Sequence, residues 1–202
     1  MNVTVYGGGY RKLSDHDIKQ CKKLGKALAS IGAEVLTGGG SGFPYQVGKA
    51  AVQAGARVYG RSPARNEQEH KQKFGFALDG VTDMIYMPKS YGNPAEGLVK
   101  RMQDMQPFSE VVISMGGNWG TFYELILSLY YKKTIIMINE FEGASVAFQN
   151  VHTYFGARDF NPKVHLGATL IPVRDTDEAI MVLKKLYKDG TNVWKLPHVP
   201  QQ

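Results

Sequence analysis

Short runs of β-type composition alternate with longer stretches of helical periodicity along almost the whole chain. Seven runs are typical of strands, at residues 3–6, 34–37, 57–61, 84–87, 110–114, 134–138 and 169–173. Helical spacing of apolar residues occurs near 15–31, 45–54, 95–105, 121–131, 145–154 and 176–188. Parallel strands need crossovers of this kind, and the helices then cover both faces of the sheet. The pattern predicts a three-layer α/β fold with a mostly parallel sheet of about seven strands.

The chain of 202 residues is of a length that fits one globular domain, and 43% of its residues are hydrophobic. It contains no internal repeat, low-complexity block or linker. We therefore expect a single domain over residues 1–190. Residues 191–202 have no periodic pattern and include prolines, which predicts an irregular tail.

Several classes of protein are disfavoured by the composition. The lone cysteine, Cys21, excludes an internal disulfide, and the sequence has no leader pattern and no apolar run near the roughly 18 residues that span a bilayer. We expect a cytoplasmic protein without membrane contact. The net charge of +6 arises partly from lysines spaced along helix surfaces, as in residues 19–26. A nucleic-acid partner is therefore the less favoured reading of this charge.

Three glycine-rich segments each follow a predicted strand, at residues 7–9, 38–42 and 116–121. Glycine lets a ligand approach the backbone, and the N-terminus of a following helix attracts phosphate. One such turn can be explained by a tight strand-to-helix connection alone, but three at successive strand ends indicate a common site. The candidate phosphate-binding residues are Gly8, Gly39, Gly40, Ser41, Gly42, Gly116, Gly117, Asn118, Gly120 and Thr121.

None of these turns fits the common nucleotide motifs. The sequence has no G-x-x-x-x-G-K-[ST] segment, and Tyr10, Arg11 and Lys12 follow the first turn where a dinucleotide motif needs a third glycine. We predict no bound cofactor. Glu67, Glu69 and His70 do not form a recognisable metal-ligand set, so we predict no metal and interpret them as loop surface.

The residues GGNWGTFYE at 116–124 resemble the glycine, threonine and glutamate signature of the Lonely Guy (LOG) family, within the wider SLOG superfamily. The resemblance extends over about residues 1–140, including 38–51 and the GRSPARNEQEH segment at 60–70. It implies a Rossmann-like nucleotide-binding domain, commonly a homodimer. Some similar proteins hydrolyse nucleoside 5′-monophosphates to free base and ribose 5-phosphate, and others are assigned only as nucleotide binders.

Arg101 and Glu124 are the candidate catalytic residues. Arg101 matches the family's arginine in type and in its distance from Gly116, and Glu124 is the glutamate of the signature. A carboxylate here could stabilise the positive charge that develops at the anomeric carbon, and the arginine could bind phosphate or hold the carboxylate ionised. Each also has a plainer explanation, since Glu124 could close a capping box and Arg101 could extend along the edge of an apolar stripe.

Two functions remain open at this point. The first is a phosphoribohydrolase acting on a nucleoside monophosphate, and the second is a non-catalytic carrier or sensor for a nucleotide or a nucleotide-like cofactor. Departures from the family pattern favour the carrier, because Met115 replaces a proline, Trp119 is a bulky residue within the turn, and residues 43–45 are altered. Trp119 and Tyr123 could stack on a base or form core or dimer contacts.

The helices predicted at 95–105 and 121–131 carry apolar residues around more than one side. A sheet face covers only one side of such a helix. Symmetric pairing through these two helices would cover the rest, so we predict a two-fold homodimer.

Overall fold

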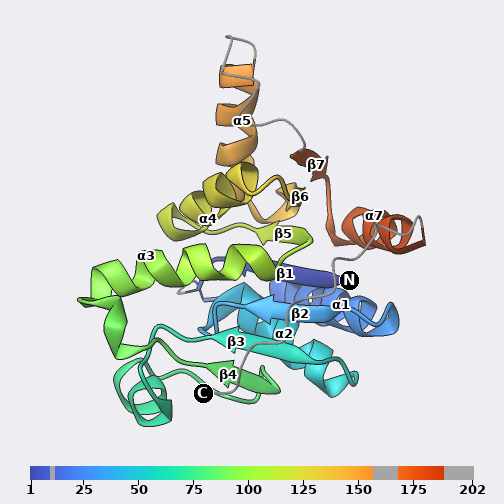
Figure 1. Cartoon of the computed structure of the whole chain (residues 1–202). Coiled ribbons are helices and arrows are strands. Elements are labelled where there is room, and N and C mark those ends of the chain that lie inside the picture. Colours follow the sequence, from blue (N-terminus) through green and yellow to red (C-terminus); the bar gives the residue numbers. More distant parts are fainter. Residues whose placement is uncertain (10–11, 157–167, 189–202) are drawn as a thin grey trace.

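The computed structural model describes residues 1–9, 12–156 and 168–188. In these residues seven strands form one sheet, in the order β4-β3-β2-β1-β5-β6-β7 (Figure 1). The strands are β1 (Asn2–Gly7), β2 (Glu34–Thr37), β3 (Val58–Arg61), β4 (Asp83–Ile85), β5 (Val111–Met115), β6 (Thr134–Ile138) and β7 (Thr169–Val173). Every pair of neighbours is parallel. The sheet predicted as mostly parallel is thus parallel throughout.

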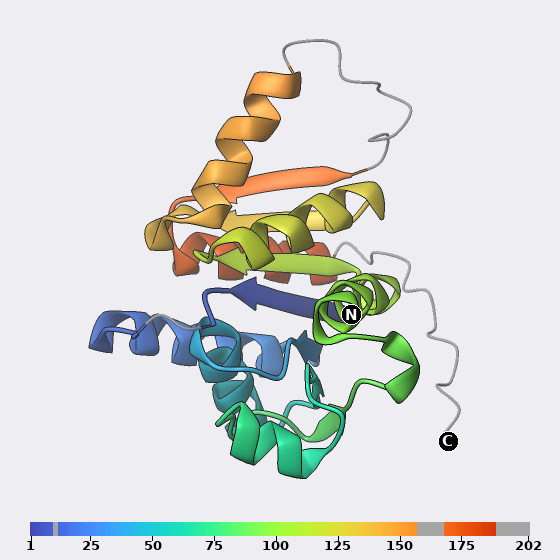
Figure 2. The same cartoon turned by 90° about the vertical axis from the view of Figure 1, so that its left-hand side faces the viewer.

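Helices cover both faces of the sheet, as the alternating pattern predicts. They are α1 (Asp15–Ser30), α2 (Gly42–Gln53), α3 (Pro94–Met105), α4 (Trp119–Tyr130), α5 (Ala144–Gly156) and α7 (Thr176–Lys188). One hydrophobic cluster joins the sheet to α1, α2 and α7, and a second joins it to α3, α4 and α5. Figure 2 shows the stack of strands from the side, with α5 toward one end and α1 and α2 toward the other.

Strand β5 illustrates why the central strands are apolar on both sides. Its residues Val111, Ile113 and Met115 pack into the first cluster, whereas Val112 packs into the second. Successive side chains of a strand point to opposite faces, and both faces of this parallel sheet are covered. The whole strand is buried as a result.

Helix α1 begins at the predicted residue. A capping box supports this start, because Ser14 Oγ accepts from the Asp17 N–H at 3.1 Å and an Asp17 oxygen accepts from the Ser14 N–H at 2.9 Å. Helices α3 and α5 begin one residue earlier than predicted, and two others begin earlier by more than that. Helix α2 begins at Gly42 and α4 at Trp119, because each glycine turn continues directly into the helix.

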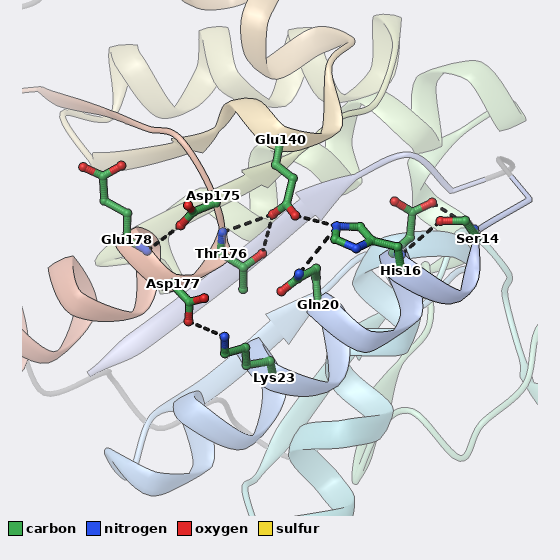
Figure 3. Close-up of polar contacts among 10 residues, drawn as sticks. Ser14, His16, Gln20, Lys23, Glu140, Asp175, Thr176, Asp177 and Glu178 are labelled. Carbon is green, nitrogen blue, oxygen red and sulfur yellow. Dashed lines mark hydrogen bonds and ion pairs between the residues drawn. The ribbon is translucent and has the colours of Figure 1, made fainter.

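Helix α7 is tied to the rest of the fold around Glu140, which lies in the 3₁₀ turn η4 (Asn139–Phe141) after β6 (Figure 3). One oxygen of Glu140 accepts hydrogen bonds from the Thr176 N–H and hydroxyl, at 3.2 and 3.1 Å. The other oxygen lies 2.6 Å from His16 Nε2 on α1. Lys23 of α1 also pairs with Asp177 of α7. These contacts join α1, η4 and α7 beside the carboxyl edge of the sheet.

Within the described ranges, no helix combines the length and apolar character needed to cross a membrane. The tail expected at 191–202 lies outside the described residues.

Candidate functional site

A pocket of about 640 Å³ opens at the carboxyl ends of the central strands. Its walls come from the segments after β1, β2, β3 and β5 and from the start of α3. Strand β1 pairs with β2 on one side and with β5 on the other, so the strand order reverses between β1 and β5. Ligands of open α/β sheets bind in the crevice at this position. The glycine turns after these strands therefore meet where the sequence predicts a common site.

The turns after β1 and β2 form one backbone unit. The Phe43 N–H donates to Gly8 O at 3.2 Å, and the Ser41 hydroxyl donates to Gly9 O. Gly42 has a φ of +72°, and a Cβ at this position would lie 1.8 Å from Gly8 O. Only glycine fits there, because any side chain would push the two turns apart. Gly40 and Ser41 line the pocket, whereas Gly8, Gly39 and Gly42 of the same turns do not.

The turn after β5 leads directly into α4. Gly117 has a φ of +92°, and a Cβ there would lie 2.3 Å from Thr121 Oγ1. Asn118 caps α4 but makes no side-chain hydrogen bond to the first turn of the helix. Since the first N–H groups of a helix have no carbonyl partner within it, they are available to an anion. Asn118, Gly120 and Thr121 line the pocket, while Gly116 and Gly117 set the course of the turn.

Arg101 reaches the floor of the pocket from α3. Its side chain is buried, and Nη1 donates to Gly38 O at 2.8 Å and to Arg61 O at 3.0 Å. These two carbonyls belong to the segments after β2 and at the end of β3. The sequence placed Arg101 at the edge of an apolar stripe, but the side chain is not extended along the surface. The side chain connects α3 to two strand ends, and its second terminal nitrogen, Nη2, faces Glu124.

Glu124 enters the same pocket from α4. Its side chain is 9% exposed, and Oε1 lies 3.8 Å from Arg101 Nη2. Burial raises the pKa of Glu124 to about 7, although the positive charge of Arg101 acts in the opposite direction. Near neutral pH the carboxyl group can therefore hold or release a proton, which suits a residue that works on a reacting bond.

The helix register rules out the capping-box explanation of Glu124. A capping box places its acidic residue three positions after the N-cap. The N-cap of α4 is Asn118, not Thr121, so Glu124 lies more than one turn inside the helix. Its carboxylate lines the pocket beside Arg101 instead of returning to the helix start.

A further part of the pocket wall was not predicted. Residues of the segment between β3 and β4 line it, and so do residues that precede α3. They include Pro63, Arg65, Glu69, Lys73, Phe74, Phe76, Tyr91 and Asn93. The segment includes a short π-helix, η1 (Glu69–Lys73), where the sequence predicts a loop. Such helices are rare and often occur at functional sites. The GRSPARNEQEH motif was the available signal, because it covers the first half of this segment.

His70 corrects the expectation of loop surface at residues 67–70. Glu67 is exposed and Glu69 is half-buried, but His70 is fully buried, with Nδ1 2.8 Å from Ser62 Oγ. Burial lowers the pKa of His70, which favours the neutral form of the ring. Ser62 is also fully buried and does not line the pocket, so it is not placed to bind a ligand. The hydrogen bond between Ser62 and His70 anchors the segment between β3 and β4, which was not predicted as part of the pocket wall. Among the described residues, no group of three metal-ligating side chains is suited to a metal ion.

The aromatic residues at the start of α4 lie outside the pocket. Trp119 is 85% exposed and contacts Phe122 edge to face, with ring centroids 6.3 Å apart. Neither Trp119 nor Tyr123 lines the pocket. The structure therefore gives no support for base stacking by these two residues, and it leaves the ring of Trp119 available on the surface.

The raised pKa of Glu124 predicts an effect of pH on stability. The ordinary pKa is 4.5 and the folded value is about 7, so the stabilisation from protonated Glu124 is complete below about 4.5 and is lost as pH rises through 7. Between pH 5 and pH 8, the free energy of unfolding of Glu124→Gln should rise by about 2 kcal/mol relative to that of the native protein. Urea unfolding at the two pH values measures this. If the difference in free energy of unfolding between the two proteins is the same at both pH values, Glu124 is not buried as described.

Comparison with known proteins assigns the chain to a family. A family model, the SLOG cluster4 family, matches residues 1–162. This chain belongs to the SLOG cluster4 family. The matched residues include every segment that forms the pocket, and they confirm the SLOG assignment made from residues 116–124. No curated protein matches the sequence of this family member.

Solved structures share the fold of this SLOG protein. TM1055 superposes with a TM-score of 0.70 at 19% identity, over 91% of this chain and 98% of that one. The molybdenum cofactor binding protein of the phototrophic bacterium Rippkaea orientalis gives 0.67 at 22% identity, over 92% and 96%. DNA processing protein A of Helicobacter pylori, which binds single-stranded DNA, gives 0.60 at 17%, over 92% and 80%. Since these likenesses concern the fold, the choice of a small ligand over nucleic acid stays a prediction.

Proposed function

We propose that the pocket binds a nucleoside 5′-monophosphate and hydrolyses its N-glycosidic bond, releasing free base and ribose 5-phosphate. The observation that carries this proposal is the buried pair of Arg101 and Glu124, 3.8 Å apart, on the floor of a pocket walled by three glycine turns. The turns offer backbone N–H groups to a phosphate, and the pair offers a carboxylate to the sugar.

The chemistry follows from the positions of these groups. The phosphate lies against residues 118–121, with the segment 38–42 as the facing wall. The ribose then lies above Glu124, whose ionised carboxylate stabilises positive charge at the anomeric carbon as the bond to the base breaks. The electron pair of that bond leaves with the base, which takes up a proton, and water adds to the anomeric carbon. The positive charge of Arg101 favours the ionised form of Glu124 against the effect of burial.

An assay of the purified protein with a panel of nucleoside monophosphates tests this function. Free base and ribose 5-phosphate should appear in equal amounts, and the matching nucleosides without phosphate should not react. Absence of base release from every nucleotide of the panel would refute the hydrolase.

A carrier of a nucleotide-like cofactor is the second candidate. The likeness to the molybdenum cofactor binding protein of R. orientalis, over more than nine tenths of both chains, favours it. The two candidates separate in the same assay, since a carrier binds its ligand tightly without releasing base. We propose the cytoplasm as the compartment of either activity.

We also propose a two-fold homodimer through α3 and α4, which predicts a measurable assembly. Leu98 and Val99 of α3 are about two fifths exposed, and Trp119 and Tyr130 of α4 are more exposed still. Burying such residues against a second copy removes apolar surface from water. Sedimentation at micromolar concentration should give about twice 22.4 kDa. A monomer that binds nucleotide would contradict this interface, and Trp119→Glu should weaken the dimer.

A further inference from the structure

Two aromatic rings lie beside the glycine turn that follows β2. The rings of Phe74 and Phe76 stack with centroids 5.6 Å apart at an interplanar angle of 22°. A Cβ at Gly40 would lie 3.6 Å from Phe76 Cζ, so this ring borders the turn directly. Both side chains line the pocket. Aromatic faces of this kind provide a surface on which a heterocyclic base can stack.

The charged groups next to these rings present donors toward the pocket. Glu69 is the carboxylate of this part of the wall, and both of its oxygens are occupied, one by Lys73 Nζ at 2.8 Å and one by the Arg65 N–H at 2.7 Å. Arg65 also donates from Nη2 to Gly92 O at 3.1 Å, which joins this segment to the start of α3. Each of these oxygens is thus already engaged by one cationic or backbone donor, and the donors left for a ligand in this segment are the remaining N–H groups of Arg65 and Lys73.

Two neutral side chains of the same wall are left with donors as well. Asn93 Oδ1 accepts from the backbone N–H groups of Ala95 and Glu96, at 3.0 and 3.1 Å, so its NH₂ group is what remains. The hydroxyl of Tyr91 accepts from Arg61 Nη2 at 3.3 Å, which leaves its proton to donate. Both residues line the pocket. We call Arg65, Lys73, Tyr91 and Asn93 the donor wall.

We propose that the donor wall selects bases whose outer edge carries carbonyl oxygens. The preferred ligand is then an oxo-substituted nucleoside monophosphate, such as inosine 5′-monophosphate, over the amino-substituted adenosine 5′-monophosphate. A carbonyl oxygen accepts from the wall, whereas the amino group of adenine is itself a donor and would meet donors. This inference rests on the proposed function, because it assumes that the phosphate lies on the glycine turns and the base on the aromatic rings.

Lys73 is the residue on which the selection can be tested. Its ammonium lies 5.5 Å from the centre of the Phe74 ring, over the ring face, so it borders the space beside the Phe74–Phe76 pair that a base would enter. Lys71 is a matched control on the same π-helix. Its ammonium pairs with Glu67, both side chains are exposed, and neither lines the pocket. Lys73→Met and Lys71→Met each remove one charge and keep an unbranched side chain that is one atom shorter.

The experiment measures the affinities of inosine and adenosine 5′-monophosphate by calorimetry in the Glu124→Gln protein, which does not consume the nucleotide, with the donor wall native or carrying either lysine variant. We expect the native donor wall to bind the inosine nucleotide about tenfold more tightly, as one charge-assisted hydrogen bond provides. Lys73→Met should bring this ratio close to one, and Lys71→Met should leave it unchanged. Phe74→Leu should weaken both nucleotides by a similar factor.

The outcomes separate this inference from the proposed function. Equal affinities for the two nucleotides, or a preference for adenosine 5′-monophosphate, would overturn the donor wall while leaving the hydrolase intact. A ratio that does not respond to Lys73→Met would overturn it too. Absence of binding by any nucleoside monophosphate would overturn both proposals. Binding without base release would overturn the hydrolase alone, because calorimetry does not depend on turnover.

Discussion

Glu124→Gln is expected to lower kcat for base release by about 1,000-fold, while the nucleotide still binds within a few-fold of its native affinity. Glutamine keeps the size and shape of the side chain, so the fold and the phosphate contacts persist. It carries no negative charge, however, and cannot stabilise a cationic anomeric carbon. The effect belongs to the transition state, where that charge develops, and so it appears in kcat more than in KM.

Steady-state assays of base release, together with calorimetry, test this expectation. Glu178→Gln is a suitable control, because Glu178 lies on α7, pairs with Arg174 just before that helix, and does not line the pocket. The native protein should also lose activity as pH falls below about 7, where Glu124 takes up a proton. If Glu124→Gln retains turnover within a few-fold, the carboxylate is not the group that assists bond breaking.

Arg101→Ala should abolish base release and also destabilise the fold. The buried guanidinium hydrogen-bonds Gly38 O and Arg61 O and faces the Glu124 carboxylate. Its removal leaves two carbonyls without their donor and a buried carboxyl without its counter-charge, which costs about 2–4 kcal/mol. The variant still folds, but with a lower Tm, and the pKa of Glu124 rises further.

Thermal melting and activity assays should be made on Arg101→Ala, Arg101→Lys and Lys100→Ala. Arg101→Lys keeps the charge but lacks the planar fork, so it recovers part of the stability and little of the activity. Lys100→Ala removes an exposed neighbouring cation of α3 and should change neither property by much. Full activity in a stable Arg101→Ala protein would refute the role of the pair.

Much of the fold could be predicted because its signals are local. Apolar runs marked the strands, and the seven observed strands lie at the predicted places with small shifts at their ends, as for β4 at Asp83–Ile85. The glycine turns marked the ligand-facing edge of the sheet, since strand-to-helix turns need positive φ at positions such as Gly117. The motif at 116–124 supplied the family.

The unpredicted parts depend on contacts between distant segments. His70 looked like loop surface because its burial depends on Phe76 and Tyr86, whose rings pack against it from farther along the chain. Arg101 was predicted as a site residue from the family motif, but its contacts could not be predicted, because its partners Gly38 O and Arg61 O are backbone atoms that leave no trace in sequence spacing. The donor wall was missed for the same reason, since it joins residues from two separate loops.

A crystal structure of the Glu124→Gln protein with inosine 5′-monophosphate tests the central claim most directly. That claim is that the glycine turns hold the phosphate and the Arg101–Glu124 pair faces the sugar. We predict the phosphate beside residues 116–121, within hydrogen-bonding distance of their backbone N–H groups, and the anomeric carbon next to residue 124. A phosphate bound elsewhere, or a sugar turned away from residue 124, would contradict the account.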